Sequence, residues 1–172
     1  MLRGFIVIAS ATWVALLGGC TTQPPSSELS NSVTGNFSAM SSSGDRWQVK
    51  RLEVNITGAS GTLNLVPIDG SGGQIPFQLT RCTVLENGTA ASLSWKSSFL
   101  DGQDADVVRC NAIGPRFAKH FAFASARSGA LTYHPPILAR MIAGTREINS
   151  DQGRIIFLWD RSGPAAYAVS KQ

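Results

Sequence analysis

Residues 46–57 read RWQVKRLEVNIT, and this stretch decides the fold class. Apolar and polar residues alternate in it with a period of two, which is the spacing of a half-buried β-strand. The apolar positions form two runs, Trp47 and Val49 followed by Leu52, Val54 and Ile56. The two runs are out of phase, and such a slip predicts a β-bulge or a sharp bend near Lys50 and Arg51.

Similar alternation extends outward from this stretch in both directions. It predicts a short first strand around Phe37, a strand through Ala91, Leu93 and Trp95, and further strands at 62–68, 74–84, 107–112, 145–149, 154–159 and 165–170. Pro76 lies inside one of these runs and indicates an edge position or a late strand start. Asn87-Gly88 is a strong hairpin signal, and residues 99–106 are expected to form a loop.

Two segments after residue 113 have less regular patterns. Residues 116–126 fit a helix with apolar residues on one face, and they also alternate as a strand. We favour a strand that forms a hairpin with residues 130–133. Residues 136–143 (PILARMIA) are expected to form a short helix, because Pro136 stands at its start and Gly144 directly follows it.

Roughly nine or ten short strands with one short helix predict an all-β domain, built as a small antiparallel barrel or a sandwich. We favour the barrel, because a meander of antiparallel strands closes both ends of the sheet most simply. Charged residues make up only 15% of the chain and 17 glycines supply turns, which suits a β-rich domain better than a helical bundle. Residues 34–172 are long enough to form a single domain with its own core.

The first twenty residues have a different character. Arg3 gives a short positively charged start, residues 5–17 form an apolar run that is short for a membrane span, and Leu17-Gly18-Gly19-Cys20 ends the run. This order resembles the lipobox of bacterial lipoproteins. The resemblance implies that residues 1–19 are a signal peptide and that Cys20 becomes the mature N-terminus, carrying a diacylglyceryl thioether and usually an N-acyl chain.

The lipobox resemblance implies a lipid-anchored protein of the bacterial cell envelope. Two or more acyl chains give stable attachment, since each buried CH₂ contributes roughly 0.8 kcal/mol. In enteric bacteria an Asp after the lipidated cysteine favours the inner membrane, and Thr21 at this position therefore favours the outer membrane. Residues 21–33 are polar, with two prolines and several serines, and therefore predict a flexible tether; together with the lipidated Cys20 that the resemblance implies, residues 20–33 are expected to be a lipidated N-terminus and tether.

Cys82 and Cys110 are the cysteines that follow Cys20. An even pair in an exported chain predicts a disulfide. It would close a loop of roughly 29 residues and stabilise the fold by about 3.6 kcal/mol in the chain-entropy treatment. A metal-binding or reactive pair is less favoured, because the chain has no C-x-x-C motif and no histidine beside either cysteine.

The sequence lacks the common catalytic motifs, with no G-x-x-x-x-G-K, H-E-x-x-H, G-x-S-x-G or S-x-x-K pattern. His120 and His134 are the only histidines, and we interpret them as ordinary core or exposed residues. Asp101, Asp104 and Asp106 are closely spaced, but their spacing does not match that of a calcium-binding loop. We interpret them as a solvated acidic loop and expect no metal.

Basic residues are concentrated in one part of a chain whose net charge is +4. The segment from Val107 to Arg146 contains no acidic residue and six basic ones, namely Arg109, Arg116, Lys119, Arg127, Arg140 and Arg146. On one face they would attract lipid headgroups, lipopolysaccharide phosphates, peptidoglycan carboxylates or an acidic protein. Scattered over the domain, they would only favour solubility. No nucleic-acid module is visible, so we expect no such partner.

The remaining aromatic signal favours core packing over ligand binding. Trp47, Trp95 and Trp159 each lie in a predicted strand, where large aromatic residues usually fill the core. The sequence therefore favours a non-enzymatic envelope lipoprotein, without a cofactor, whose β-domain binds or scaffolds another envelope component. The alternative is a carrier whose barrel cavity holds a lipid-like or small apolar molecule. An enzyme is least favoured; a pocket that joins either histidine to an acid and a nucleophile would support it.

Overall fold

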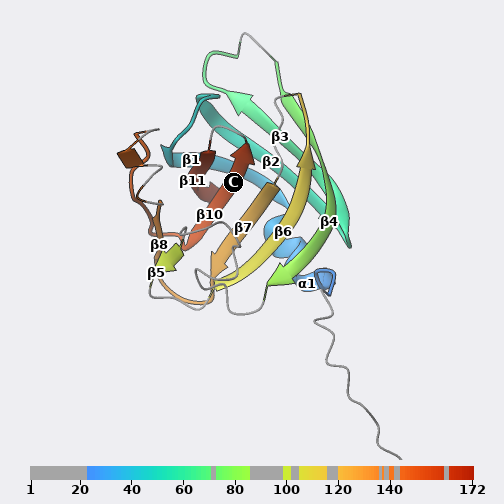
Figure 1. The fold of residues 1–172 in the computed structure, drawn as a ribbon. Coiled ribbons are helices and arrows are strands. Elements are labelled where there is room, and N and C mark those ends of the chain that lie inside the picture. The colour runs from blue at the N-terminus through green and yellow to red at the C-terminus, as the bar shows by residue number, and fades with distance from the viewer. Residues whose placement is uncertain are drawn as a thin grey trace, which may run out of the picture.

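The computed structural model describes residues 23–70, 73–85, 99–101, 105–115, 120–135, 137, 140–141, 144–160 and 163–172, and these ranges consist mainly of strands (Figure 1). The elements are α1 (Ser27–Val33), β1 (Gly35–Ser43), β2 (Val49–Thr57), β3 (Ser60–Pro67), β4 (Ile75–Leu85), β5 (Phe99–Asp101), β6 (Ala105–Ile113), β7 (His120–Ala126), β8 (Leu131–His134), β9 (Ile148–Ser150), β10 (Arg154–Asp160) and β11 (Gly163–Lys171).

Eight of the strands form a closed antiparallel barrel in the order β1-β11-β10-β7-β6-β4-β3-β2. The sheet closes on itself because β1 pairs with β2 along one edge and with β11 along the other. The predicted all-β fold is therefore confirmed, and of the two architectures considered it is the barrel. The strands β5, β8 and β9 form a separate three-stranded sheet at the lower left of Figure 1.

The phase slip predicted in residues 46–57 is confirmed as a β-bulge. The register between β2 and β3 passes from Val49 opposite Pro67 to Arg51 opposite Val66, which leaves Lys50 as the extra residue. The extra residue of such a bulge reverses, from that point on, which alternate side chains face the interior. Val49 and Leu52 are consequently both buried, although an unbroken strand would place them on opposite faces.

A second bulge lies in β4 and positions the disulfide. Between Thr80 and Thr83 the register of β4 against β6 shifts, and Arg81 adopts a left-handed backbone with φ of 52°. The shift turns Cys82 inward, where it forms a disulfide with Cys110 of β6 across a Cα–Cα distance of 4.1 Å. The predicted cysteine pair is therefore present and joins two neighbouring barrel strands.

Large side chains fill the barrel interior. Phe37 of β1 and Phe123 of β7 belong to strands separated by two others, yet their ring centroids lie 5.3 Å apart. Trp47, in the loop after β1, packs edge-on against Phe77 of β4 with centroids 6.5 Å apart. Eight-stranded barrels are just wide enough for side chains to fill them or to hold one small ligand. The contact between Phe37 and Phe123 shows that large side chains reach across the interior of this barrel.

A second core lies outside the barrel, between its wall and the sheet of β5, β8 and β9. Strand β10 contributes to both cores, because Ile156 and Leu158 face the interior while Ile155 and Phe157 face outward. Phe157 meets Tyr133 of β8 edge-on, with ring centroids 5.0 Å apart. The small sheet therefore covers an apolar patch of the barrel wall that water would otherwise contact.

A half-buried carboxylate organises the end of the barrel where β1 finishes. Asp45 Oδ1 accepts hydrogen bonds from the Trp47 amide and the Tyr167 hydroxyl, each at 2.9 Å, and its Oδ2 accepts one from the Val49 amide at 2.9 Å. These bonds join the β1–β2 loop to β11. They also give the buried Tyr167 hydroxyl a partner, as a buried polar group requires.

Several local predictions need correction, chiefly because strand partners were misjudged. Residues 120–126 are a strand as favoured, but β7 pairs with β6 and β10, so the expected hairpin with residues 130–133 does not form. Within the predicted loop 99–106, residues 99–101 form β5 and Ala105 begins β6. The C-terminal strands are not one meander either, because β9 pairs with β8.

The remaining local predictions have mixed outcomes. The Pro76 prediction is wrong in both forms: β4 begins at Ile75 with Pro76 already paired to Asn64 of β3, and it lies between β3 and β6 in the closed barrel, although its pairing with β6 starts only at Gln78. The described positions of the helix expected at 136–143, which are 137, 140 and 141, have helical backbone. The Asn87-Gly88 hairpin and the strand through Trp95 lie outside the described residues.

Replacing both Cys82 and Cys110 with alanine should lower the free energy of unfolding by about 3.6 kcal/mol, because the unfolded chain regains the entropy of the open loop. Urea unfolding under non-reducing conditions measures this change. Wild-type protein unfolded with a reductant is the control and should match the double variant. Equal midpoints for the variant and the oxidised wild type would contradict the prediction.

Candidate functional site

The helix α1 begins and ends on clear local signals. Ser26 is its N-cap, and the Ser26 Oγ accepts a hydrogen bond from the Leu29 amide at 3.2 Å. Glu28 places a negative charge in the first turn, where it interacts favourably with the positive end of the helix dipole. Thr34 returns to an extended backbone and leads directly into β1. These seven helical residues correct the expectation of a flexible tether across residues 20–33.

Packing and hydrogen bonds hold α1 against one end of the barrel. Val33 is only 1% exposed and belongs to the interior core, and Leu29 packs against the same core. Thr34 Oγ1 accepts from the Ile56 amide at 3.0 Å, which ties the end of the helix to β2. Lys171 Nζ donates to the Asn31 carbonyl at 3.2 Å, which adds a contact from β11. The domain therefore starts before residue 34.

The residues before α1 are also attached to the barrel. The Val84 amide of β4 donates to the Gln23 carbonyl at 3.1 Å. Two residues earlier on β4, the Cys82 amide donates to the Ala59 carbonyl at 2.9 Å. Gln23 and Ala59 therefore lie next to each other along the same stretch of β4. The chain is thus fixed to the domain from Gln23 onward.

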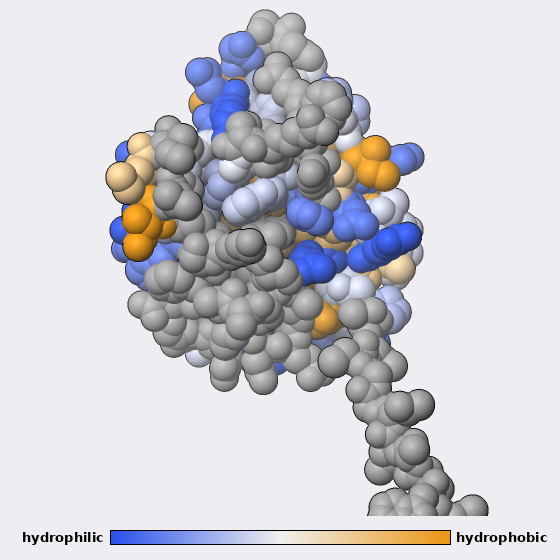
Figure 2. Space-filling view, in the orientation of Figure 1, coloured by the Kyte–Doolittle hydropathy of each residue, from blue (hydrophilic) through white to orange (hydrophobic). Residues whose placement is uncertain are grey.

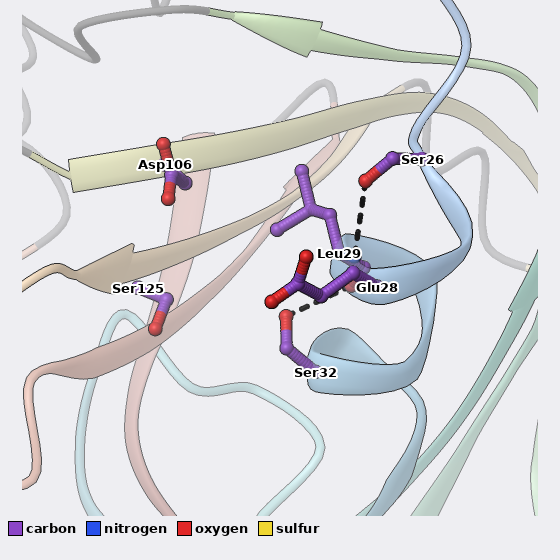
Figure 3. A pocket seen from close by; sticks show the side chains of 6 residues that line it. All are labelled: Ser26, Glu28, Leu29, Ser32, Asp106 and Ser125. Atoms are coloured by element: carbon purple, nitrogen blue, oxygen red, sulfur yellow. Dashed lines mark hydrogen bonds between the residues drawn. The ribbon is translucent and has the colours of Figure 1, made fainter.

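A pocket of about 430 Å³ opens between α1 and the adjoining ends of β6 and β7 (Figure 3). Among the described residues, six line it, and five of these are polar: Ser26, Glu28, Leu29, Ser32, Asp106 and Ser125. Figure 3 shows the helix residues on one side and Asp106 and Ser125 on the strands opposite. The volume is within the range of small-ligand pockets, but those are predominantly apolar.

The polar lining of this pocket limits its chemistry. Asp106 is paired with Arg127, whose Nη2 lies 2.7 Å from the Asp106 Oδ1. Arg127 is 53% exposed, so this is a surface ion pair whose energetic contribution is small. Hydroxyl and carboxylate groups can hold water or a polar group by hydrogen bonds. The lining residues that the structure describes include no histidine or cysteine.

The predicted basic residues are spread along the barrel. Arg127 follows β7 at the α1 end, whereas the Arg146 amide donates at 2.7 Å to the hydroxyl of Ser43, which ends β1 at the opposite end. Arg109 lies in the middle of β6 and is half-buried, and Arg140 is exposed. Arg116 and Lys119 lie outside the described residues. An anion-binding face that used Arg127 and Arg146 together would have to span the length of the barrel.

The histidines lie in different sheets. His120 begins β7 in the barrel wall, and His134 ends β8 in the small sheet. His134 Nδ1 lies 2.8 Å from Glu147 Oε2, which ties β8 to the residues before β9. For the His134–Glu147 pair to act in catalysis, a nucleophile or a substrate site would have to lie beside it. The described pocket is lined by other residues.

The structure describes only some of the residues of the predicted acidic loop and only some of the tryptophans. Asp101 ends β5, Asp106 lies in β6 with Arg127 as its partner, and Asp104 lies outside the described residues. Within the part of the chain that the structure describes, no three metal-ligating side chains come together. Trp47 is buried in the interior core, and Trp159 packs against the outer core.

The sequence interpretation missed α1 and therefore the pocket beside it. A signal was present: Ser26 is a favoured N-cap residue, and Leu29 and Val33 are four residues apart, which places them on one helical face. Two apolar residues in a serine-rich stretch are a weak pattern. Their burial depends on the barrel, which closes far away in the sequence.

No known protein family, curated protein or solved structure matches this chain. Among the described residues, none of the helices has the length and apolar character needed to cross a membrane. The barrel, its disulfide and the helix-capped pocket are therefore the observations from which a function has to be inferred.

Replacing Val33 with alanine should lower the free energy of unfolding by about 2 kcal/mol, because two buried methyl groups and their packing against the barrel are lost. The loosened helix should also release Gln23, so the Val84 amide should exchange with solvent faster. Urea unfolding and native-state hydrogen exchange measure the two effects. Ser27→Ala, at an exposed position of the same helix, is the control and should change stability by less than about 0.5 kcal/mol. Equal effects of the two substitutions would contradict the packing of α1.

Proposed function

We propose that this chain is a lipid-anchored protein of the bacterial cell envelope whose barrel is a non-enzymatic domain that binds or scaffolds another envelope component. The observation that carries the proposal is the agreement between the lipobox-like Leu17-Gly18-Gly19-Cys20 and the Cys82–Cys110 disulfide inside the domain. Stable disulfides are found mainly in exported proteins. Two unrelated features of the chain therefore favour the same compartment.

The packed interior supports a binding or scaffolding role over the alternative role as an apolar carrier. A carrier of this kind needs an apolar cavity inside the barrel. In this barrel Phe37 and Phe123 meet across the central space, and Trp47 packs against Phe77. The pocket beside α1 has a polar lining, which does not suit a lipid-like ligand. Binding is therefore assigned to the outer surface.

The outer surface offers one pair of exposed apolar side chains at helical spacing. Ile137 and Met141 are 74% and 78% exposed, lie four positions apart in the sequence, and each has helical backbone. Figure 2 shows apolar atoms at the left edge of the molecule, where the short helical ribbon lies in Figure 1, away from α1. Exposed apolar side chains that share a helix face are typical of contacts with a partner protein.

Replacing Cys20 with serine should prevent lipidation, because a serine hydroxyl cannot provide the thioether. Metabolic labelling with a radioactive fatty acid and detergent phase partitioning measure this change. We expect label and detergent partitioning for the wild type and neither for Cys20→Ser. Cys82→Ala combined with Cys110→Ala is the control and should retain the label. A labelled Cys20→Ser protein would contradict the anchor.

A photo-crosslinking residue at Met141 should capture a specific envelope component in intact cells. The same residue at Thr57, an exposed position at the α1 end, is the control. A protein or polymer captured at Met141 and not at Thr57 would support the binding role. Co-purification of a stoichiometric lipid with the barrel of Cys20→Ser, with no capture at Met141, would instead support the carrier.

A further inference from the structure

We infer that the α1 end of the barrel faces the surface of the bilayer at close range and that the domain does not stand off on a flexible tether. This inference rests on the proposed lipidation of Cys20. It adds an orientation and a surface of contact, namely the end formed by α1, the β2–β3 turn and the end of β4. The partner of that surface is the layer of phospholipid headgroups.

The first argument is the length of chain between the anchor and the domain. Gln23 is already attached to the barrel, because its carbonyl accepts from the Val84 amide at 3.1 Å. Cys20 is three residues earlier in the chain. Three residues span at most about 11 Å even when fully extended. The acyl chains on Cys20 would therefore hold Gln23 within about 11 Å of the membrane interface.

The second argument is that Gln23 belongs to a firmly packed part of the domain. Ser26 caps α1 three residues later, and Val33 buries the other end of the helix in the interior core. Moving Gln23 away from β4 would break its hydrogen bond and loosen this packing. The short link therefore holds this whole end of the barrel close to the anchor.

The third argument concerns what this end of the barrel presents to the headgroups. Ala59, in the turn between β2 and β3, is exposed and lies next to Gln23 along β4. Arg81, one residue before the disulfide, is also exposed at this end. A guanidinium group is well suited to lipid phosphates. The exposed Arg81 and the exposed Glu28 of α1 make this surface polar and of mixed charge, which suits contact with headgroups and does not call for insertion into the hydrocarbon layer.

The two ends of β3 offer reporter positions at different distances from the α1 end, which allows this orientation to be tested. Ala59 precedes it and Ile68 follows it, and both are exposed. Eight residues of strand span about 26 Å, and a strand tilt of about 40° in a barrel leaves roughly 20 Å along the barrel axis. A reporter at Ala59 should therefore lie roughly 20 Å closer to the bilayer than one at Ile68.

The test uses lipidated full-length protein with Ala59→Cys or Ile68→Cys, each labelled with a small fluorophore and reconstituted in phosphatidylcholine–phosphatidylglycerol vesicles. Some of the lipids carry a nitroxide quencher on the headgroup. We expect quenching at Ala59 to be several-fold stronger than at Ile68. Inserting about fifteen Gly and Ser residues between Thr22 and Gln23 should remove most of this difference, because such a linker spans roughly 20 Å on average.

The outcomes separate this inference from the proposed function. Mass spectrometry of the reconstituted protein establishes whether Cys20 carries acyl chains; an unmodified Cys20 would overturn the proposed function and the orientation together. Acylated protein with equal quenching at both positions, or stronger quenching at Ile68, would overturn the orientation alone. A difference that survives the linker insertion would show that the short link does not set it. Photo-crosslinking of Ala59 to a protein in cells, without quenching in vesicles, would assign this surface to a protein partner instead.

Discussion

The pairing of β1 with β2 on one side and β11 on the other is the constraint on which the rest of the structure depends. It brings the two ends of the domain together and removes the sheet edges that would otherwise pair with other chains. Closure with eight strands also fixes the width of the interior. Phe37 of β1 then reaches Phe123 of β7 across that interior. Backbone pairing and core packing therefore stabilise the same closed state, which makes partial opening unfavourable.

The segments on either side of β1 cover the two ends of the barrel that β1 closes. Before β1, α1 places Val33 in the interior core. After β1, Asp45 accepts hydrogen bonds from the buried Tyr167 hydroxyl and from the amides of Trp47 in its own loop and Val49 at the start of β2. Each end therefore depends on residues next to the closing strand. Among the described residues, large side chains such as Phe37 and Phe123 therefore occupy part of the interior between these two covered ends.

The sequence predicted what depends on local pattern and failed where a partner is distant. The alternation in residues 46–57 revealed both β2 and its bulge at Lys50, because side-chain direction follows from the neighbouring residues alone. The cysteine pair was also predictable, from the even number of cysteines after Cys20 and the expectation of export. By contrast, β7 pairs with β6 and β10, and nothing in its own residues distinguishes those partners from β8. The helix α1 was missed for the same reason, since Val33 is buried only by a barrel that closes much later in the chain.

Attachment to a membrane also changes how much contact area a binding surface needs for association. If lipidation confines both the protein and its partner to one membrane surface, their effective concentration is high, and a small contact area is sufficient for association. The exposed apolar residues are consistent with such a contact, since Ile137 and Met141 form a pair rather than an extended patch. The helical segment that carries them lies on the side away from α1 (Figure 1). If both proposals hold, membrane attachment near Gln23 and partner binding at this segment use different parts of the molecule.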